Sequence, residues 1–139
     1  MIVKTTRNYS PNFYEKKRSK KDIKFLIFHY TGMKSELLAI KRLTDFQSEV
    51  ASHYFIRKNG EIISLVPDLY IAWHAGKSSW RKYKSINKNS IGIEISNPGH
   101  RFGYENFSKK QIKNLNKLSK YLIKKYKIKK NLILGHSDI

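Results

Sequence analysis

The chain has 139 residues and a mass of 16.4 kDa, a length typical of a single domain. Hydrophobic residues make up 40% of it, enough for a packed core, and the absence of cysteine excludes disulfides, thiolate zinc ligands and a cysteine nucleophile. The 29 lysines and arginines against 10 acidic residues give a net charge of +19, which favours polyanionic partners, although a lysine-rich solvated surface explains the charge equally well.

The first 22 residues are polar and contain the basic run Glu15 to Lys21. We expect a basic N-terminal arm over residues 1–22, poorly ordered or draped on the surface, followed by one domain over residues 23–139. No hydrophobic region of a secretory signal is visible, and no apolar run approaches the roughly 18 residues of a membrane span. These features predict a cytoplasmic protein without a membrane span, or a periplasmic one if the N-terminus is incomplete; we also expect a monomer.

The next segments alternate between strand and helix patterns. Residues 23–30 are a β-rich apolar run typical of a buried strand, and residues 35–50 carry apolar residues at helical spacing behind Ser35, a candidate N-cap. Residues 52–57 and 61–66 flank Asn59-Gly60, a strong hairpin signal.

After a loop over residues 67–89, residues 90–95 predict another strand. Ser108 and Gln111 fit a capping box that opens a helix reaching Tyr126, and eight lysines predict that its outer faces are solvent-exposed. Residues 131–134 predict a last strand. The expected fold is therefore α/β, a single domain with a central mixed β-sheet flanked by helices.

Two histidines lie in matching positions, because His29 and His136 each follow or end an apolar strand. If both strands belong to one sheet, the two side chains can converge at one rim. Neutral imidazole is a usual zinc ligand, whereas a single histidine at a strand end is more often structural. Both interpretations stay open from the pattern alone.

Glu94 is conspicuous among few carboxylates, because it lies inside the apolar strand on the face opposite Ile93 and Ile95. It could act as a general base toward water, or simply face solvent on a half-exposed strand. The segment from Ala72 to Trp80 is too aromatic for an ordinary linker, and loops of this composition often line ligand grooves. Trp73 could instead fill the core.

Several motifs occur together in the order typical of one enzyme family: His29-Tyr30-Thr31, Ser52 to Ile56, Asn59 to Ile62, Leu65-Val66-Pro67, Ala72 to Gly76, Ser90 to Glu94 and Gly135 to Ile139. Over residues 23–139 the chain resembles the type 2 zinc N-acetylmuramoyl-L-alanine amidases, related to phage lysozyme-type amidases and peptidoglycan recognition proteins. Ser78 to Arg81 and Asn97-Pro98-Gly99 look closest to the branch that also accepts anhydro-muropeptides.

This resemblance implies zinc-dependent hydrolysis of the amide between N-acetylmuramic acid and L-alanine in peptidoglycan or muropeptides, in cell-wall degradation or recycling. It implies His29 and His136 as zinc ligands and Glu94 as the catalytic carboxylate. It also implies substrate contacts that involve Tyr30, His53, Trp73, His74 and Asn97.

Two departures from the family pattern affect this expectation. The third ligand, an Asp, and a nearby Lys belong to a segment about ten residues beyond His136, so the C-terminal end appears missing and Asp138 is a poor replacement. Ser52 stands where phage-type enzymes carry a catalytic Tyr, and Tyr54 could substitute for it.

Two other functions compete with the amidase. One is a catalytically impaired peptidoglycan-binding module of the same fold. The other is a nucleic-acid binder that uses the lysine-rich helix, but the chain has no aromatic RNA-binding pattern, recognition helix or phosphate-binding loop. We therefore expect a peptidoglycan or muropeptide partner and no specific nucleic acid.

Overall fold

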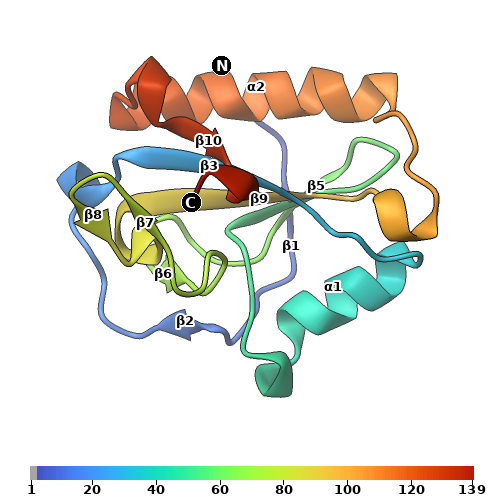
Figure 1. Cartoon of the computed structure of the whole chain (residues 1–139), viewed down its shortest axis with the longest axis horizontal. Coiled ribbons are helices and arrows are strands. Elements are labelled where there is room, and N and C mark those ends of the chain that lie inside the picture. Colours follow the sequence, from blue (N-terminus) through green and yellow to red (C-terminus); the bar gives the residue numbers. More distant parts are fainter. Residues whose placement is uncertain (1–2) are drawn as a thin grey trace.

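The computed structural model describes residues 3–139, and six strands in this range form one mixed sheet in the order β1-β5-β4-β9-β3-β10 (Figure 1). The strands are β1 (Thr6–Arg7), β3 (Phe25–Tyr30), β4 (Tyr54–Ile56), β5 (Ile62–Ser64), β9 (Ser90–Ile95) and β10 (Ile133–Gly135). Strands β4, β9, β3 and β10 run parallel, and β5 runs antiparallel to β4. The predicted α/β class with a central mixed sheet is confirmed.

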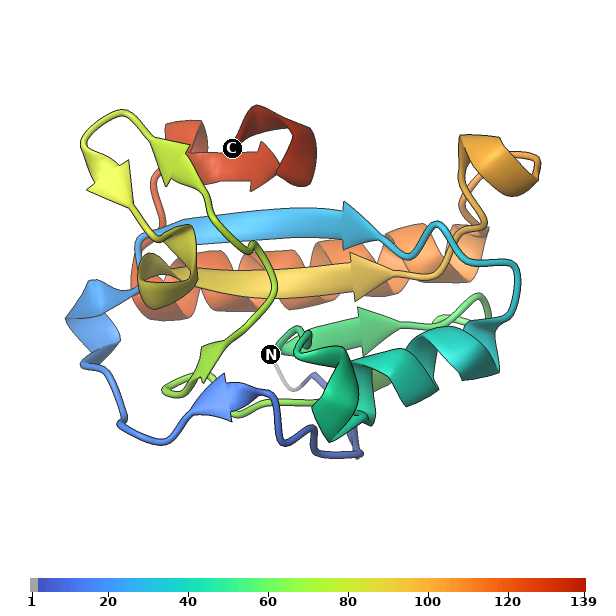
Figure 2. The same ribbon diagram turned by 60° about the horizontal axis from the view of Figure 1, so that its bottom comes forward.

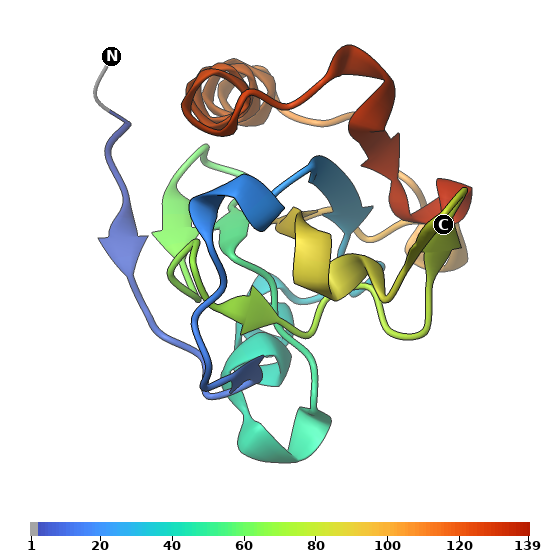
Figure 3. The same cartoon turned by 90° about the vertical axis from the view of Figure 1, so that its left-hand side faces the viewer.

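The two faces of the sheet are covered by different helices, as Figure 3 shows in a view almost along α2. Helix α2 (Lys109–Tyr126) buries Leu118 and Leu122 in the core cluster that contains Ile91 and Ile93 of β9. Helix α1 (Glu36–Thr44) lies on the other side, where Ala39 and Leu43 share a cluster with Phe55 of β4 (Figure 2).

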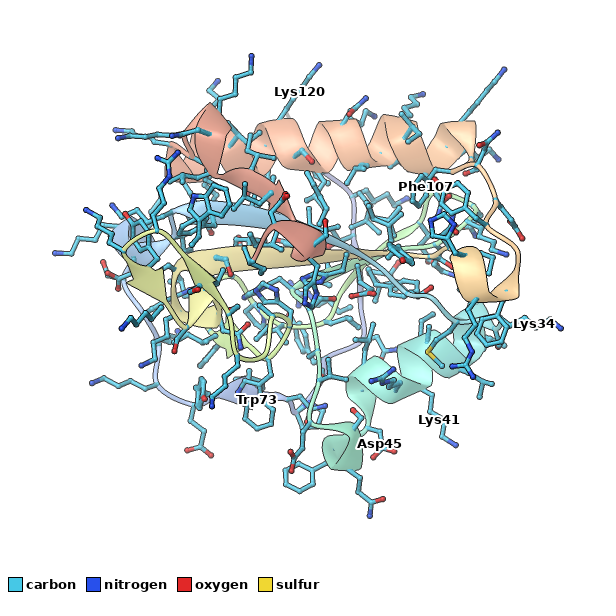
Figure 4. The ribbon with its side chains drawn as sticks, viewed as in Figure 1. Lys34, Lys41, Asp45, Trp73, Phe107 and Lys120 are labelled. Atoms are coloured by element: carbon cyan, nitrogen blue, oxygen red, sulfur yellow. The ribbon has the colours of Figure 1, made fainter. Side chains whose placement is uncertain are left out.

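Helix α2 begins with the predicted capping box. The Ser108 hydroxyl accepts a hydrogen bond from the Gln111 amide at 3.1 Å, and the Gln111 side chain accepts one from the Ser108 amide at 2.9 Å. The eight lysines of this segment are all exposed, as Figure 4 illustrates for Lys120, which points away from the body of the molecule. The predicted solvent-exposed lysine face is confirmed.

Helix α1 starts after Ser35, whose hydroxyl accepts from the Leu38 amide, as predicted. It ends at Thr44, so the expectation of a helical segment reaching residue 50 was wrong. The Asp45 carboxylate accepts from the Gln47 amide and starts a separate 3-10 turn, Phe46–Ser48, and Glu49 closes that turn in a left-handed conformation.

The hairpin β4–β5 forms around Asn59-Gly60, as predicted. Gly60 has φ of 89°, and a Cβ there would lie 2.9 Å from side-chain atoms of Lys110 and Asn114 on α2. Glycine is therefore required both by the turn and by the close approach of the helix.

The N-terminal segment is joined to the rest of the fold at several points. Strand β1 pairs with β5, and β2 (Phe13–Tyr14) pairs with β6 (Ile71–Ala72). Asn12 and Arg18 are buried, and the Arg18 guanidinium donates to the backbone carbonyls of Asp68, Asn87 and Lys88. Polar side chains thus anchor residues 3–22 where apolar ones are scarce, while most of this segment stays exposed on the surface, as in the surface-draped alternative. Residues 1 and 2 lie outside the described residues, and the domain boundary at residue 23 stays a prediction.

The loop between β6 and β9 carries a short hairpin of β7 (Ser79–Trp80) and β8 (Tyr83–Lys84). Within residues 3–139, no helix combines the length and the apolar character needed to cross a bilayer.

Candidate active site

The parallel strands bring the predicted site residues to one edge of the sheet. His29 and Glu94 are the next-to-last residues of β3 and β9, and they are paired in the strand register. His136 follows β10 directly, and its neighbour Gly135 pairs with Phe28 of β3. The carboxyl ends of parallel strands are the usual place for a ligand site in such sheets.

A cleft of about 750 Å³ opens at this edge. Its walls are mostly apolar and include Leu43 of α1 and Phe107, which precedes α2 (Figure 4). Among the residues that line it, Glu94 supplies the carboxylate and Arg42 the guanidinium. The cleft thus combines an apolar body with a few polar groups, as expected for a substrate site.

The two histidines of the site face each other. The Nδ1 atoms of His29 and His136 lie 2.8 Å apart, and the rings are nearly perpendicular. Burial, together with the neighbouring His136, lowers the pKa of His29 to about 3. His29 is therefore neutral at physiological pH, the form that binds a metal ion.

His29 and His136 are close enough to supply two ligands to one zinc ion. Two nitrogens that each bond one zinc ion at about 2.0–2.1 Å must lie within roughly 4 Å of each other, and these do. The residues described contain no group of three metal-binding side chains. The Asp138 carboxylate instead accepts a hydrogen bond from the Gly135 amide at 2.9 Å.

Glu94 has an environment suited to proton transfer. Burial raises the pKa of Glu94 to about 8, and the positive charge of Arg42 opposes that shift. A base whose pKa lies near neutrality can both take up and release a proton during turnover. Among residues 3–139, no group donates a hydrogen bond to this carboxylate, so it stays available to a substrate or a water molecule.

Two of the predicted substrate contacts line the cleft. Tyr30 is half exposed at its mouth, and its ring packs so closely that a Cβ on Gly99 would lie 2.7 Å from it. His74 also lines the cleft but is only 6% exposed, and its Nδ1 lies 2.9 Å from His29 Nε2.

The other predicted contacts lie elsewhere. His53 is fully buried, where its Nδ1 accepts from the Gly92 amide and its Nε2 donates to the Tyr70 carbonyl. Asn97 is buried and donates to the Glu105 carbonyl. Trp73 packs its edge against Tyr14 at the lower edge of the molecule in Figure 4. None of these three residues is among those that line the cleft.

Tyr54 does not replace the missing tyrosine. It pairs with Ile93 rather than Glu94, so it faces α2, and its hydroxyl donates to Asp68 at 2.6 Å. The suggested substitution was therefore wrong, because Tyr54 and Glu94 leave opposite faces of the sheet.

Three residues near the site were not recognised in the sequence. Arg42 of α1 lines the cleft, the Ser90 hydroxyl lies 2.8 Å from His74 Nε2, and Gly92 lies against the His74 ring. Gly92 alone had a sequence signal, since a glycine inside a strand often marks a close approach of another group.

Comparisons with known proteins agree with this geometry. The family model described as Amidase_2, N-acetylmuramoyl-L-alanine amidase, matches residues 19–139. The N-acetylmuramoyl-L-alanine amidase AmiD of Escherichia coli K12 is 39% identical over 129 residues, which cover 84% of this chain and 46% of that protein. The 1,6-anhydro-N-acetylmuramyl-L-alanine amidase AmpD of Haemophilus influenzae is 30% identical, covering 94% of this chain and 78% of that protein.

A solved structure shows the same fold. The complex of E. coli AmiD with the substrate anhydro-N-acetylmuramic acid-L-Ala-D-γ-Glu-L-Lys matches with a TM-score of 0.75 and 38% identity, covering 85% of this chain and 49% of that one. The chain spans about half the length of AmiD.

Proposed function

The chain belongs to the N-acetylmuramoyl-L-alanine amidase family, and from this premise we propose that it hydrolyses the amide between N-acetylmuramic acid and L-alanine in peptidoglycan or its muropeptide fragments. The observation that carries the proposal is the convergence of His29, His136 and Glu94 in one cleft. A zinc ion together with a carboxylate base is one set of groups that can hydrolyse an amide at neutral pH.

His29 and His136 would hold the zinc ion through their facing Nδ1 atoms. When bound, zinc polarises a carbonyl oxygen and lowers the pKa of water. Burial lowers the pKa of His29 to about 3, so no proton competes with a metal ion for its ligand nitrogen at neutral pH.

Glu94 moves the protons of the reaction. Its carboxylate takes a proton from the attacking water as the carbon–oxygen bond forms at the lactyl carbonyl. It then gives that proton to the nitrogen of L-alanine as the carbon–nitrogen bond breaks. The pKa of about 8 suits both steps, and most of the surface of the cleft around the carboxyl group is apolar.

A second candidate is a module that binds muropeptides without cleaving them. One observation favours it: the Asp138 carboxylate caps the Gly135 amide, and the described residues bring two imidazoles together without a third ligand beside them. A site with two protein ligands would hold zinc less tightly than one with three.

The test is to incubate the protein and Glu94→Gln with an anhydro-muropeptide, with zinc and with a chelator, and to detect free stem peptide by mass spectrometry. Binding is measured in parallel by calorimetry. Zinc-dependent release by the wild type alone supports the amidase, and binding without release supports the second candidate. Neither release nor binding would overturn both. Parallel incubation with intact cell-wall sacculi distinguishes recycling of fragments from degradation of the wall.

A further inference from the structure

A buried chain of hydrogen bonds runs from the site into the sheet. His29 Nε2 lies 2.9 Å from His74 Nδ1, and His74 Nε2 lies 2.8 Å from the Ser90 hydroxyl. The Ser90 hydroxyl in turn donates to the Ile86 carbonyl at 2.7 Å. His74 and Ser90 are both buried, so solvent does not replace these partners.

The donor and acceptor roles in this chain follow from its far end. Because the Ser90 hydroxyl gives its single proton to the Ile86 carbonyl, it must accept from His74 Nε2–H. A neutral imidazole carries one N–H, so His74 Nδ1 has the lone pair and accepts from His29 Nε2–H. The remaining lone pair of His29 is then on Nδ1, the atom that faces His136.

The surroundings of His74 hold its ring in place. The imidazole is 6% exposed, and it packs edge to face with His29 and His53 at centroid distances of 5.1 and 5.8 Å. The backbone amides of His74 and Ala75 both donate to the Asn87 side chain, which holds the start of the loop in place.

Gly92 provides an independent sign that the ring position is built into the fold. A Cβ at this position of β9 would lie 2.5 Å from Cγ of His74, so the imidazole lies directly against the strand backbone. Any other residue at position 92 would displace the His74 ring.

We propose that His74 is a positioning residue that fixes the tautomer of His29, so that the Nδ1 lone pair points at the zinc position. The proposal rests on the proposed function only for the identity of the metal. It replaces the expected substrate contact of His74 with a role exerted through His29. Partners of this kind orient metal-binding histidines, and their loss typically weakens metal affinity by about 10–100-fold.

Two variants of His74 separate this role from simple packing. In His74→Gln the amide oxygen can accept from His29 and the amide nitrogen can donate to Ser90, whereas His74→Leu fills much of the space without hydrogen bonds. His100→Gln, at an exposed histidine stacked on Tyr104, is the control for the loss of a histidine.

The first measurement is the tautomer of His29 in the zinc-free protein, from long-range nitrogen–proton NMR spectra of the imidazole. We expect the Nε2–H form in the wild type, in His100→Gln and in His74→Gln, and a mixture in His74→Leu. The second is zinc affinity by competition with a chromophoric chelator, where His74→Leu should bind about 10–100-fold more weakly and His74→Gln should stay within a few-fold of the wild type.

A His29 that keeps the Nε2–H form and full zinc affinity in His74→Leu would overturn the proposal. So would a wild-type His29 in the Nδ1–H form. If His74→Leu does not fold, Ser90→Ala decides, since removing the acceptor of His74 should also mix the tautomers of His29. A wild type that hydrolyses no muropeptide would contradict the proposed function, while the NMR result on His29 would still test the role of His74.

Discussion

His29 and Glu94 are paired in the register of the adjacent parallel strands β3 and β9. Because paired residues of neighbouring strands leave the same face of a sheet, the imidazole and the carboxylate enter the cleft side by side. Their relative position is therefore set by backbone hydrogen bonds of the central sheet and not by a flexible loop.

Replacing Glu94 by Gln keeps the shape of the side chain and removes its basicity. We expect kcat for muropeptide hydrolysis to fall by about 10²–10⁴-fold, while zinc affinity and muropeptide binding stay near wild-type values. Turnover within a few-fold of the wild type would assign the base to another group.

The same variant should change the pH dependence of stability. In the folded wild type the pKa of Glu94 is raised from 4.5 to about 8, so the unfolded chain releases this proton first as the pH rises. The wild type therefore loses stability relative to Glu94→Gln between pH 4.5 and 8, and the gap is largest above pH 8. Urea midpoints of both proteins at several pH values measure it; parallel curves would show that Glu94 is not held in a buried environment.

Acid should destabilise the protein through its buried histidines. Burial lowers the pKa of His29 to about 3 and of His53 to about 4, and that of His74 lies well below 6.5. Below pH 6.5 the unfolded chain takes up protons that the folded chain refuses, so each histidine contributes stability that is lost as the pH falls, by about 1.4 kcal/mol per pH unit.

Glu94 has the opposite effect, because down to pH 4.5 the folded chain holds a proton there that the unfolded chain has released. The three histidines and Glu94 together therefore lower the free energy of unfolding by about 2.7 kcal/mol per pH unit as the pH falls. The measurement is the free energy of unfolding in urea between pH 7 and 5, without added metal. A stability that stays constant over this range would contradict the buried, neutral state of these histidines.

Arg42 should recognise the acidic part of a muropeptide. It lines the cleft with Glu94, and in the part of the chain that the structure describes it forms no ion pair with a carboxylate. Because a γ-linked glutamate carries a free α-carboxylate, Arg42→Met should raise KM several-fold for a tripeptide substrate and change kcat little. Amidation of that carboxylate should abolish the difference between the two proteins. An equal effect of the mutation on charged and amidated substrates would contradict this pairing.

Gly92→Ala should weaken zinc binding, although Gly92 is not itself one of the expected zinc ligands. The new methyl group would meet the His74 ring at 2.5 Å, so the ring must move and its bond to His29 must lengthen. We expect lower thermal stability and weaker zinc binding in this variant. Gly103→Ala, at a glycine with no atom within 4 Å of an added Cβ, is the control for space, although its φ of 84° adds local strain. Unchanged zinc affinity in Gly92→Ala would show that His74 tolerates displacement.

The sequence predicted the elements of the fold well where a local signal exists. The capping box at Ser108 and the Asn59-Gly60 turn act within a few residues, and both form as expected. The convergence of His29 and His136 also followed from strand ends, because parallel strands of one sheet bring those ends together.

The sequence could not predict on which face of the sheet some of the side chains lie. Alternation places Tyr54 and Glu94 on definite sides of their own strands, but the register between the strands decides that they face opposite ways. The sequence also gave no sign that Arg18 is buried, since its three carbonyl acceptors belong to residues 50 or more positions further along the chain. Likewise, His53 and His74 look alike in sequence, and only the fold separates a fully buried histidine from one in contact with His29.

The proposed reaction is hydrolysis of the amide between muramic acid and L-alanine, with zinc held by His29 and His136. The most direct measurement is mass spectrometry of an anhydro-muropeptide digest carried out with zinc in water enriched in the heavy oxygen isotope. We predict one heavy oxygen in the new lactyl carboxylate, none in the released peptide, and no product with His136→Ala or a chelator. Label in the peptide, cleavage at another bond, or undiminished cleavage by His136→Ala would contradict the account.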